Sequence, residues 1–156
     1  MQTSVEYRSR AVRSLVELHN VELRSFLQAW KRFIDSGRPL PEAHGDEDYQ
    51  SRERLLGHVL MAQRGYLTRI GEWIGRPVND VDASMEPIEI AGRAAQFAEE
   101  VLAAYPRHLA SVTKEELEPQ THRTRWGELM SVELLLEHAV VHPMRHRIQL
   151  ERIIEG

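Results

Sequence analysis

The sequence contains no cysteine and no long uninterrupted run of apolar residues. Without cysteine, a disulfide, a thiolate metal ligand and a cysteine nucleophile are all excluded. Any metal ion would therefore have to be bound by histidine, aspartate or glutamate side chains. Because a membrane span or a secretion signal needs a continuous apolar run, we expect a cytoplasmic protein with no membrane partner.

The chain also lacks a concentration of charge of one sign. Its 20 basic and 24 acidic residues are interspersed, and the formal net charge is -4. Proteins that bind nucleic acid usually gather basic residues into a patch or stripe, so nucleic acid is not expected as a partner. With 156 residues, of which 42% are hydrophobic, the chain suits one compact domain, which we expect to span residues 1–156.

Four segments have apolar residues at the spacing of three to four that is typical of amphipathic helices. They cover residues 12–34, 55–74, 87–104 and 132–154. Pro106 is expected to bend or end the third segment, and Ser131 is expected to be the N-cap of the fourth. Residues 113–127 are predicted to form a long connection, and no strand is predicted. The fold class that follows is all-α, a four-helix bundle.

The fourth segment contains the sequence HAVVHPMRH, in which His138, His142 and His146 are spaced four residues apart. At about 100° per residue they share one stripe of a helix with Gln149. Most other positions of this segment are apolar, so the helix is expected to be largely buried, and polar groups in such a place need partners. A metal ion would explain them, because two imidazoles four residues apart can reach one ion. Pro143 either bends this helix to aim His142 or has no functional meaning.

Two ligands from one helix do not complete a catalytic metal site, so a third must come from another helix. His58 is the best candidate, because it lies beside the apolar stripe of the second segment, in line with the small residue Ala62. His19 competes with it from a core-facing position of the first segment, as a fourth ligand, a pocket base or a hydrogen-bonded core residue. The alternative to a metal site is that a pair of histidines four residues apart arose by chance, since the chain has eight histidines. No role is expected for the histidines in or near loops, which are His44, His108 and His122.

Three motifs, in their order and separation, resemble the DinB/YfiT-like superfamily over nearly the whole chain. They are a histidine early in the second segment (LLGHVL), a Trp-Gly before the last segment (RWGE), and H-x-x-x-H-x-x-Q within it (HPMRHRIQ). The resemblance implies a four-helix bundle that holds one divalent metal ion through His58, His142 and His146. We expect zinc or nickel, since imidazole is a usual ligand of both.

Three other polar side chains are expected near the metal ion, but not as its ligands. Gln149 is expected to orient His146, and His138 is expected to line the pocket or to form a hydrogen bond in the outer shell. His19 remains a candidate for a pocket or outer-shell residue. Ile148 departs from the pattern, because many members of the superfamily have glycine at this position.

Members of the superfamily share a fold but differ in activity, and those with known roles include thiol S-transferases and a mycothiol-dependent isomerase. Three neutral histidines leave a metal ion at least one open position, where it would lower the pKa of a bound water or thiol. Because the chain has no cysteine, a thiol would have to arrive as a low-molecular-weight cosubstrate.

Two hypotheses follow. The first is a metal-dependent enzyme that acts on a small-molecule substrate, either as an S-transferase that activates a thiol or as a hydrolase that activates water. The second is a non-catalytic, metal-stabilised helical bundle with a stress-related binding or interaction role. In both cases a homodimer is expected, because similar bundles often pair through an exposed helix face.

Overall fold

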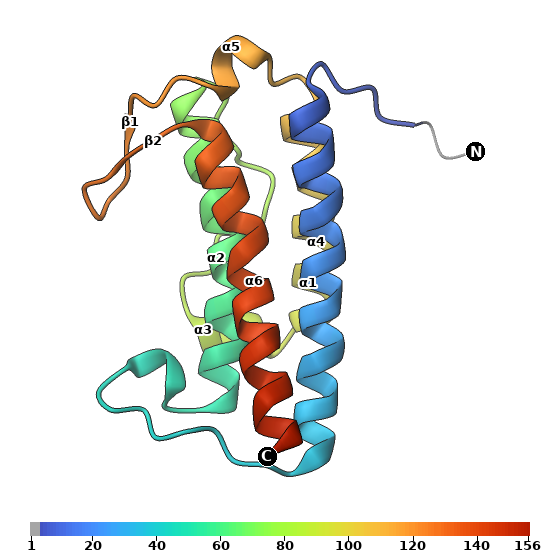
Figure 1. Ribbon diagram of the computed structural model, residues 1–156, viewed down its shortest axis with the longest axis vertical. Helices are drawn as coiled ribbons and strands as arrows, with labels where there is room; N and C mark the ends of the chain where they lie inside the picture. Colours follow the sequence, from blue (N-terminus) through green and yellow to red (C-terminus); the bar gives the residue numbers. More distant parts are fainter. Residues whose placement is uncertain (1–3) are drawn as a thin grey trace.

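The computed structural model, which describes residues 4–156, is a bundle of four long helices (Figure 1). They are α1 (Arg10–Ser36), α2 (Arg52–Trp73), α4 (Ala94–Leu109) and α6 (Val132–Glu155). Helices α1 and α6 run in one direction, and α2 and α4 run in the other. The predicted all-α class and four-helix bundle are therefore confirmed.

Serine side chains determine where three of the long helices begin. Ser9, Ser51 and Ser131 have extended backbones, and each side chain accepts a hydrogen bond from the backbone N–H three residues later. Such a cap satisfies one of the backbone donors that a first helical turn leaves unpaired. At the other end of α1, Gly37 has a φ of 67°, a left-handed conformation that glycine adopts at little cost.

The segment predicted as one third helix is divided in two. Helix α3 (Pro87–Ala91) begins with a proline in its first turn, and the backbone then turns at Gly92 and Arg93 before α4 starts. Pro106 does not end α4, which continues to Leu109. The sequence did not indicate this break, because apolar residues keep helical spacing on both sides of it.

The break allows α3 to lie directly against α2. A Cβ atom built on Gly57 would lie 1.9 Å from the carbonyl oxygen of Pro87, far closer than any real Cβ contact. Only glycine therefore permits this approach of the two backbones. Since Gly57 precedes His58, the contact fixes α3 against the part of α2 that carries this histidine.

The connections between the long helices contain short elements. Helix α5 (Lys114–Leu117) is a single turn, and β1 (His122–Arg123) and β2 (Leu129–Met130) form an antiparallel hairpin with His122 opposite Met130. The prediction of no strand was wrong, because strands of two residues are too short to show alternation. The loop between α1 and α2 also contains a 3-10 helix, η1 (Glu47–Tyr49).

Apolar side chains from all four long helices form one core. Its largest fully buried members include Phe26 and Phe33 of α1, Leu55 and Leu60 of α2, Phe97 and Tyr105 of α4, and Leu135 of α6. Helix α6 is less buried than expected, because Leu134 and Val141 are 37% and 41% exposed on the side that faces away from the bundle. Within residues 4–156, no helix has both the length and the apolar content that a membrane span requires.

Candidate metal centre

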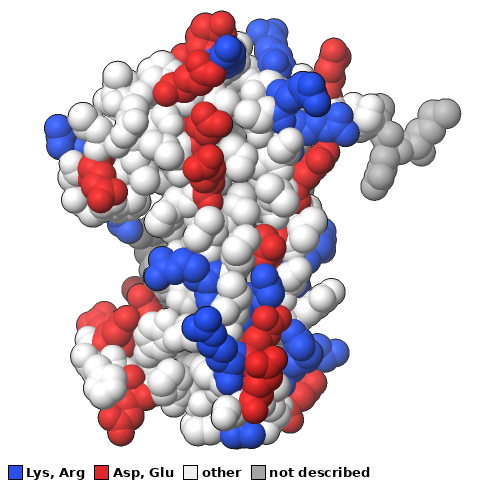
Figure 2. All heavy atoms as spheres, viewed as in Figure 1, with Lys and Arg blue, Asp and Glu red and all other residues white. Residues whose placement is uncertain are grey.

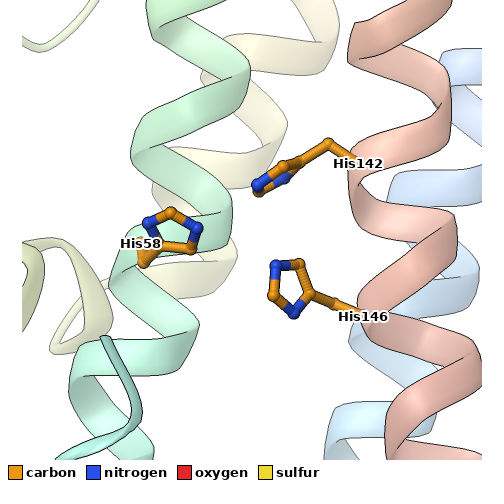
Figure 3. Close-up of side chains that lie close together, drawn as sticks. All are labelled: His58, His142 and His146. Carbon is orange, nitrogen blue, oxygen red and sulfur yellow. The ribbon is translucent and has the colours of Figure 1, made fainter. Parts of the chain in front are cut away.

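Three histidines come together in the space between α2 and α6 (Figure 3). His58 lies near the start of α2, and His142 and His146 lie one turn apart on α6. One ring nitrogen from each lies within 4.8 Å of the other two, and all three side chains are partly buried. The ring centroids of His142 and His146 are 4.8 Å apart, and that of His58 lies 5.1 Å and 5.6 Å from them. These three residues could hold a metal ion.

Each of these imidazoles uses its Nδ1 atom for a contact outside the triad. The three contacts are His58 with Oδ2 of Asp48 at 3.1 Å, His142 with Nε2 of Gln63 at 3.3 Å, and His146 with Oε1 of Gln149 at 3.3 Å. Oxygen acceptors on Nδ1 of His58 and His146 leave Nε2 of these two rings as the nitrogen available to a metal ion. The amide N–H of Gln63 instead donates to Nδ1 of His142, and this contact holds the ring without making Nε2 its unprotonated nitrogen. The chain therefore offers a donor set, with supporting partners, that fits a divalent ion.

The 3-10 helix η1 contributes two residues that sequence reasoning missed. Asp48 contacts His58, and the Tyr49 hydroxyl donates a hydrogen bond to Oε1 of Gln149 at 2.9 Å. Gln149 thus lies between Tyr49 and His146, with its Oε1 in contact with both. No periodicity marks the loop that contains η1, and the only available signal was an acidic run, DED, shortly before the second helix.

Gln63, also missed, links the triad to the core. Its Oε1 lies 3.0 Å from Nε2 of His19, and its Nε2 donates to the carbonyl of Val59 at 3.1 Å and faces Nδ1 of His142. His19 is completely buried and stacks on the ring of Tyr105 with centroids 3.8 Å apart. Burial lowers the pKa of His19 to about 4. The structure thus places His19 in the core as a neutral, hydrogen-bonded residue, separated from the triad by Gln63.

Burial also keeps the histidine pair of α6 neutral. Loss of solvent, reinforced by the neighbouring imidazoles and Arg145, lowers the pKa of His142 to about 3. Loss of solvent and the nearby His58 lower the pKa of His146 to about 4, although its contact with Gln149 acts in the opposite direction. Because metals bind neutral imidazole, both side chains are in the binding form well below neutral pH.

His138 lies one turn before His142 and outside the triad. Its ring meets Tyr66 edge-on, with centroids 5.2 Å apart, and lies 5.9 Å from that of Trp126. Tyr66 in turn lies 5.8 Å from the ring of His142. Burial raises the pKa of Tyr66 to about 12, so its phenol stays protonated and is able to donate a hydrogen bond.

A cavity of about 450 Å³ opens beside the triad. Its lining includes His58 and His142 of the triad, together with Tyr66, Arg125 and Trp126. The volume lies within the range of about 300–1,000 Å³ that is usual for small-molecule sites. Figure 2 shows the surface hollowed on the left of the view, between the β-hairpin above and the loop after α1 below. A small molecule in the cavity would contact the triad directly.

The sequence matches the model of one known protein family. The DinB family model matches residues 23–154, a region that contains the triad and most of the bundle. Comparisons with curated proteins and with solved structures gave no match. The match confirms the resemblance inferred from the sequence motifs, and the chain belongs to the DinB family.

Proposed function

We propose that the protein binds one divalent metal ion through His58, His142 and His146 and uses it to activate a small thiol or water. The observation that carries the proposal is the convergence of three imidazoles, each with a partner on Nδ1, beside a cavity. Three neutral ligands would leave the ion its full charge and at least one position for an exogenous ligand, as in catalytic sites. The cavity favours an enzyme over a purely structural metal site.

The residues of the chain would supply orientation and a proton donor. Asp48, Gln63 and Gln149 hold the three rings, and the Tyr66 phenol, protonated at neutral pH, donates a hydrogen bond to a ligand in the cavity. When bound, the ion lowers the pKa of a thiol or water in its open position. Because the chain has no cysteine, the thiol belongs to a cosubstrate. Histidine donors suit zinc or nickel.

Metal analysis of purified variants tests the proposed site. Elemental analysis should find close to one divalent ion per chain in the wild type and a large loss in His142→Ala and His146→Ala. His44→Asn is the matched control, because His44 is exposed and has a positive φ that asparagine tolerates. A wild-type protein that cannot be loaded with metal would show that the assignment of the site is wrong.

A second experiment separates a thiol from water as the activated ligand. The cobalt-substituted protein is titrated with low-molecular-weight thiols while its visible spectrum is recorded. A thiolate that binds the ion should add an intense charge-transfer band. A spectrum that does not respond would exclude the thiol version, and hydrolysis of small esters and amides by the zinc-loaded protein would then be measured against His146→Ala.

A further inference from the structure

Helix α6 presents one row of side chains on the side that faces away from the bundle. The members of this row follow one another at intervals of three or four residues and are Leu134, Glu137, Val141, Arg145 and Ile148. All of them are exposed or partly exposed, with 37% exposure at Leu134 and 41% at Val141. Such intervals return a helix to the same side, so the row is continuous over about 21 Å. We call this row the outer stripe.

The apolar members of the outer stripe have the spacing of a helix that packs against another helix. Leu134, Val141 and Ile148 are seven residues apart, and a repeat of seven keeps one seam of a helix facing its partner. Ile148 also lines a shallow groove with Pro41 and Ile153, which leaves room for an apolar side chain from outside. The stripe therefore suits a second helix laid along α6.

Two members of the outer stripe carry opposite charges that are free for a partner. The ion pairs and side-chain hydrogen bonds of residues 4–156 include neither Glu137 nor Arg145, whereas the nearby Arg147 pairs with Glu22 and Glu151. Figure 2 shows acidic side chains over the upper part of α6 and basic side chains along its lower part. The stripe is thus acidic toward the start of α6 and basic toward its end.

We propose that the outer stripe binds the same stripe of a second copy of the chain, antiparallel, around a two-fold axis at Val141. This axis exchanges positions that are equally far from Val141 in the sequence. Leu134 therefore lies opposite Ile148 of the second copy, and Glu137 lies opposite Arg145 of the second copy. Every apolar residue of the stripe meets an apolar residue, and every charge meets its opposite.

Charge also discriminates against other ways of pairing two such stripes. A parallel arrangement would place Glu137 against Glu137 and Arg145 against Arg145, which is repulsive at both positions. An antiparallel arrangement in which Glu137 meets Arg152 would place Leu134 opposite Glu155 and leave it without an apolar partner. Since the stripe contains none of the triad histidines, the inference does not depend on the proposed metal site. One helix from each chain gives a small interface, so we expect a weak dimer with a micromolar dissociation constant.

Because the chain has no cysteine, a single introduced thiol tests the position of the axis. In Val141→Cys the thiol would face its own copy. Helices whose axes lie about 8–10 Å apart bring facing Cα atoms within the range of about 4.4–6.8 Å that a disulfide needs. Mild oxidation should therefore convert this variant to a covalent dimer. Gln96→Cys, at an exposed position of α4, is the matched control and should remain largely monomeric under the same oxidation.

Charge reversal tests the pairing of Glu137 with Arg145, with sedimentation velocity as the measurement. Glu137→Arg and Arg145→Glu each replace two symmetry-related ion pairs with repulsive contacts, so the dissociation constant should rise by at least about tenfold. The double variant exchanges the two charges and should dimerise like the wild type. An equimolar mixture of the single variants should also dimerise, since one is basic and the other acidic at both positions. Gln96→Arg is the control and should leave the dissociation constant unchanged.

Circular dichroism should show that all variants are folded, as expected for substitutions at exposed positions of helices. A wild type that stays monomeric at about 100 µM would overturn the inference and leave the stripe to a different protein. Equal crosslinking of Val141→Cys and Gln96→Cys, or a dimer that neither single reversal weakens, would overturn it as well. A double variant that stays monomeric would show that Glu137 and Arg145 do not face each other.

Discussion

The Nδ1 atom of His58 lies 3.1 Å from Oδ2 of Asp48, and this contact joins the loop after α1 to the helix that supplies the first histidine of the triad. A carboxylate at this distance accepts a hydrogen bond from Nδ1–H, which in a neutral ring leaves Nε2 as the nitrogen able to bind a metal ion. The loop is therefore part of the site as well as a connection between helices.

Asp48→Ala should weaken metal binding by about 10- to 100-fold, because His58 would lose the partner that fixes its ring and its protonated nitrogen. Competition with a chromophoric chelator measures the affinity. Glu47→Ala serves as the control, since Glu47 lies in the same 3-10 helix and is exposed. Equal affinities of the two variants would show that the contact of Asp48 with His58 does not support the site.

Gln63→Leu should destabilise the protein by about 1–3 kcal/mol, because the completely buried His19 would lose its hydrogen-bond partner. Urea denaturation measures the change in the free energy of unfolding. Gln96→Leu, at an exposed position of α4, is the matched control, and a Gln63 variant as stable as this control would contradict the prediction.

Without metal, the protein should lose stability in mildly acidic solution. Burial lowers the pKa of His19 and His146 to about 4 and that of His142 to about 3, below the ordinary value of about 6.5. The unfolded chain therefore gains protons as the pH falls below about 6.5, while the folded chain does not until about pH 4. The free energy of unfolding should fall with decreasing pH in this window, by about 1.4 kcal/mol per pH unit for each imidazole.

Urea denaturation of the chelator-treated protein across this window gives the slope. The double variant His142→Ala/His146→Ala should retain only the contribution of His19 among these three histidines, and its slope should be shallower. A wild-type free energy of unfolding that stays constant between about pH 6.5 and pH 4 would show that the three imidazoles are not held neutral by the fold.

Gly57→Ala should destabilise the protein by about 1–3 kcal/mol, because the new methyl group would collide with the backbone of Pro87. The better helix propensity of alanine, about 1 kcal/mol, offsets this only in part. Gly65→Ala, in the same helix, is the control: nothing lies within 4 Å of its added Cβ, so it should stabilise the protein or leave it unchanged. Thermal denaturation measures the melting temperatures of both variants. Similar melting temperatures would contradict the close packing of α3 on α2.

Sequence reasoning was most successful where the signal was local. The periodicity of apolar residues identified the four long helices, and Ser131 was correctly identified as an N-cap. The three histidines that the structure places together were those named from motifs, with Gln149 beside His146. The division of the third helix and the short hairpin were missed, because neither interrupts nor creates a periodicity long enough to recognise.

The sequence by itself determined the helices, the absence of thiolate chemistry and the histidine stripe of α6, because these depend on residue type and on spacing along one helix. Only the tertiary structure decided which side chains support the triad. Asp48 and Tyr49 reach it from η1, and Gln63 reaches it from α2. Such contacts depend on how the helices and loops pack together, and the spacing of residues along the chain carries no record of that packing.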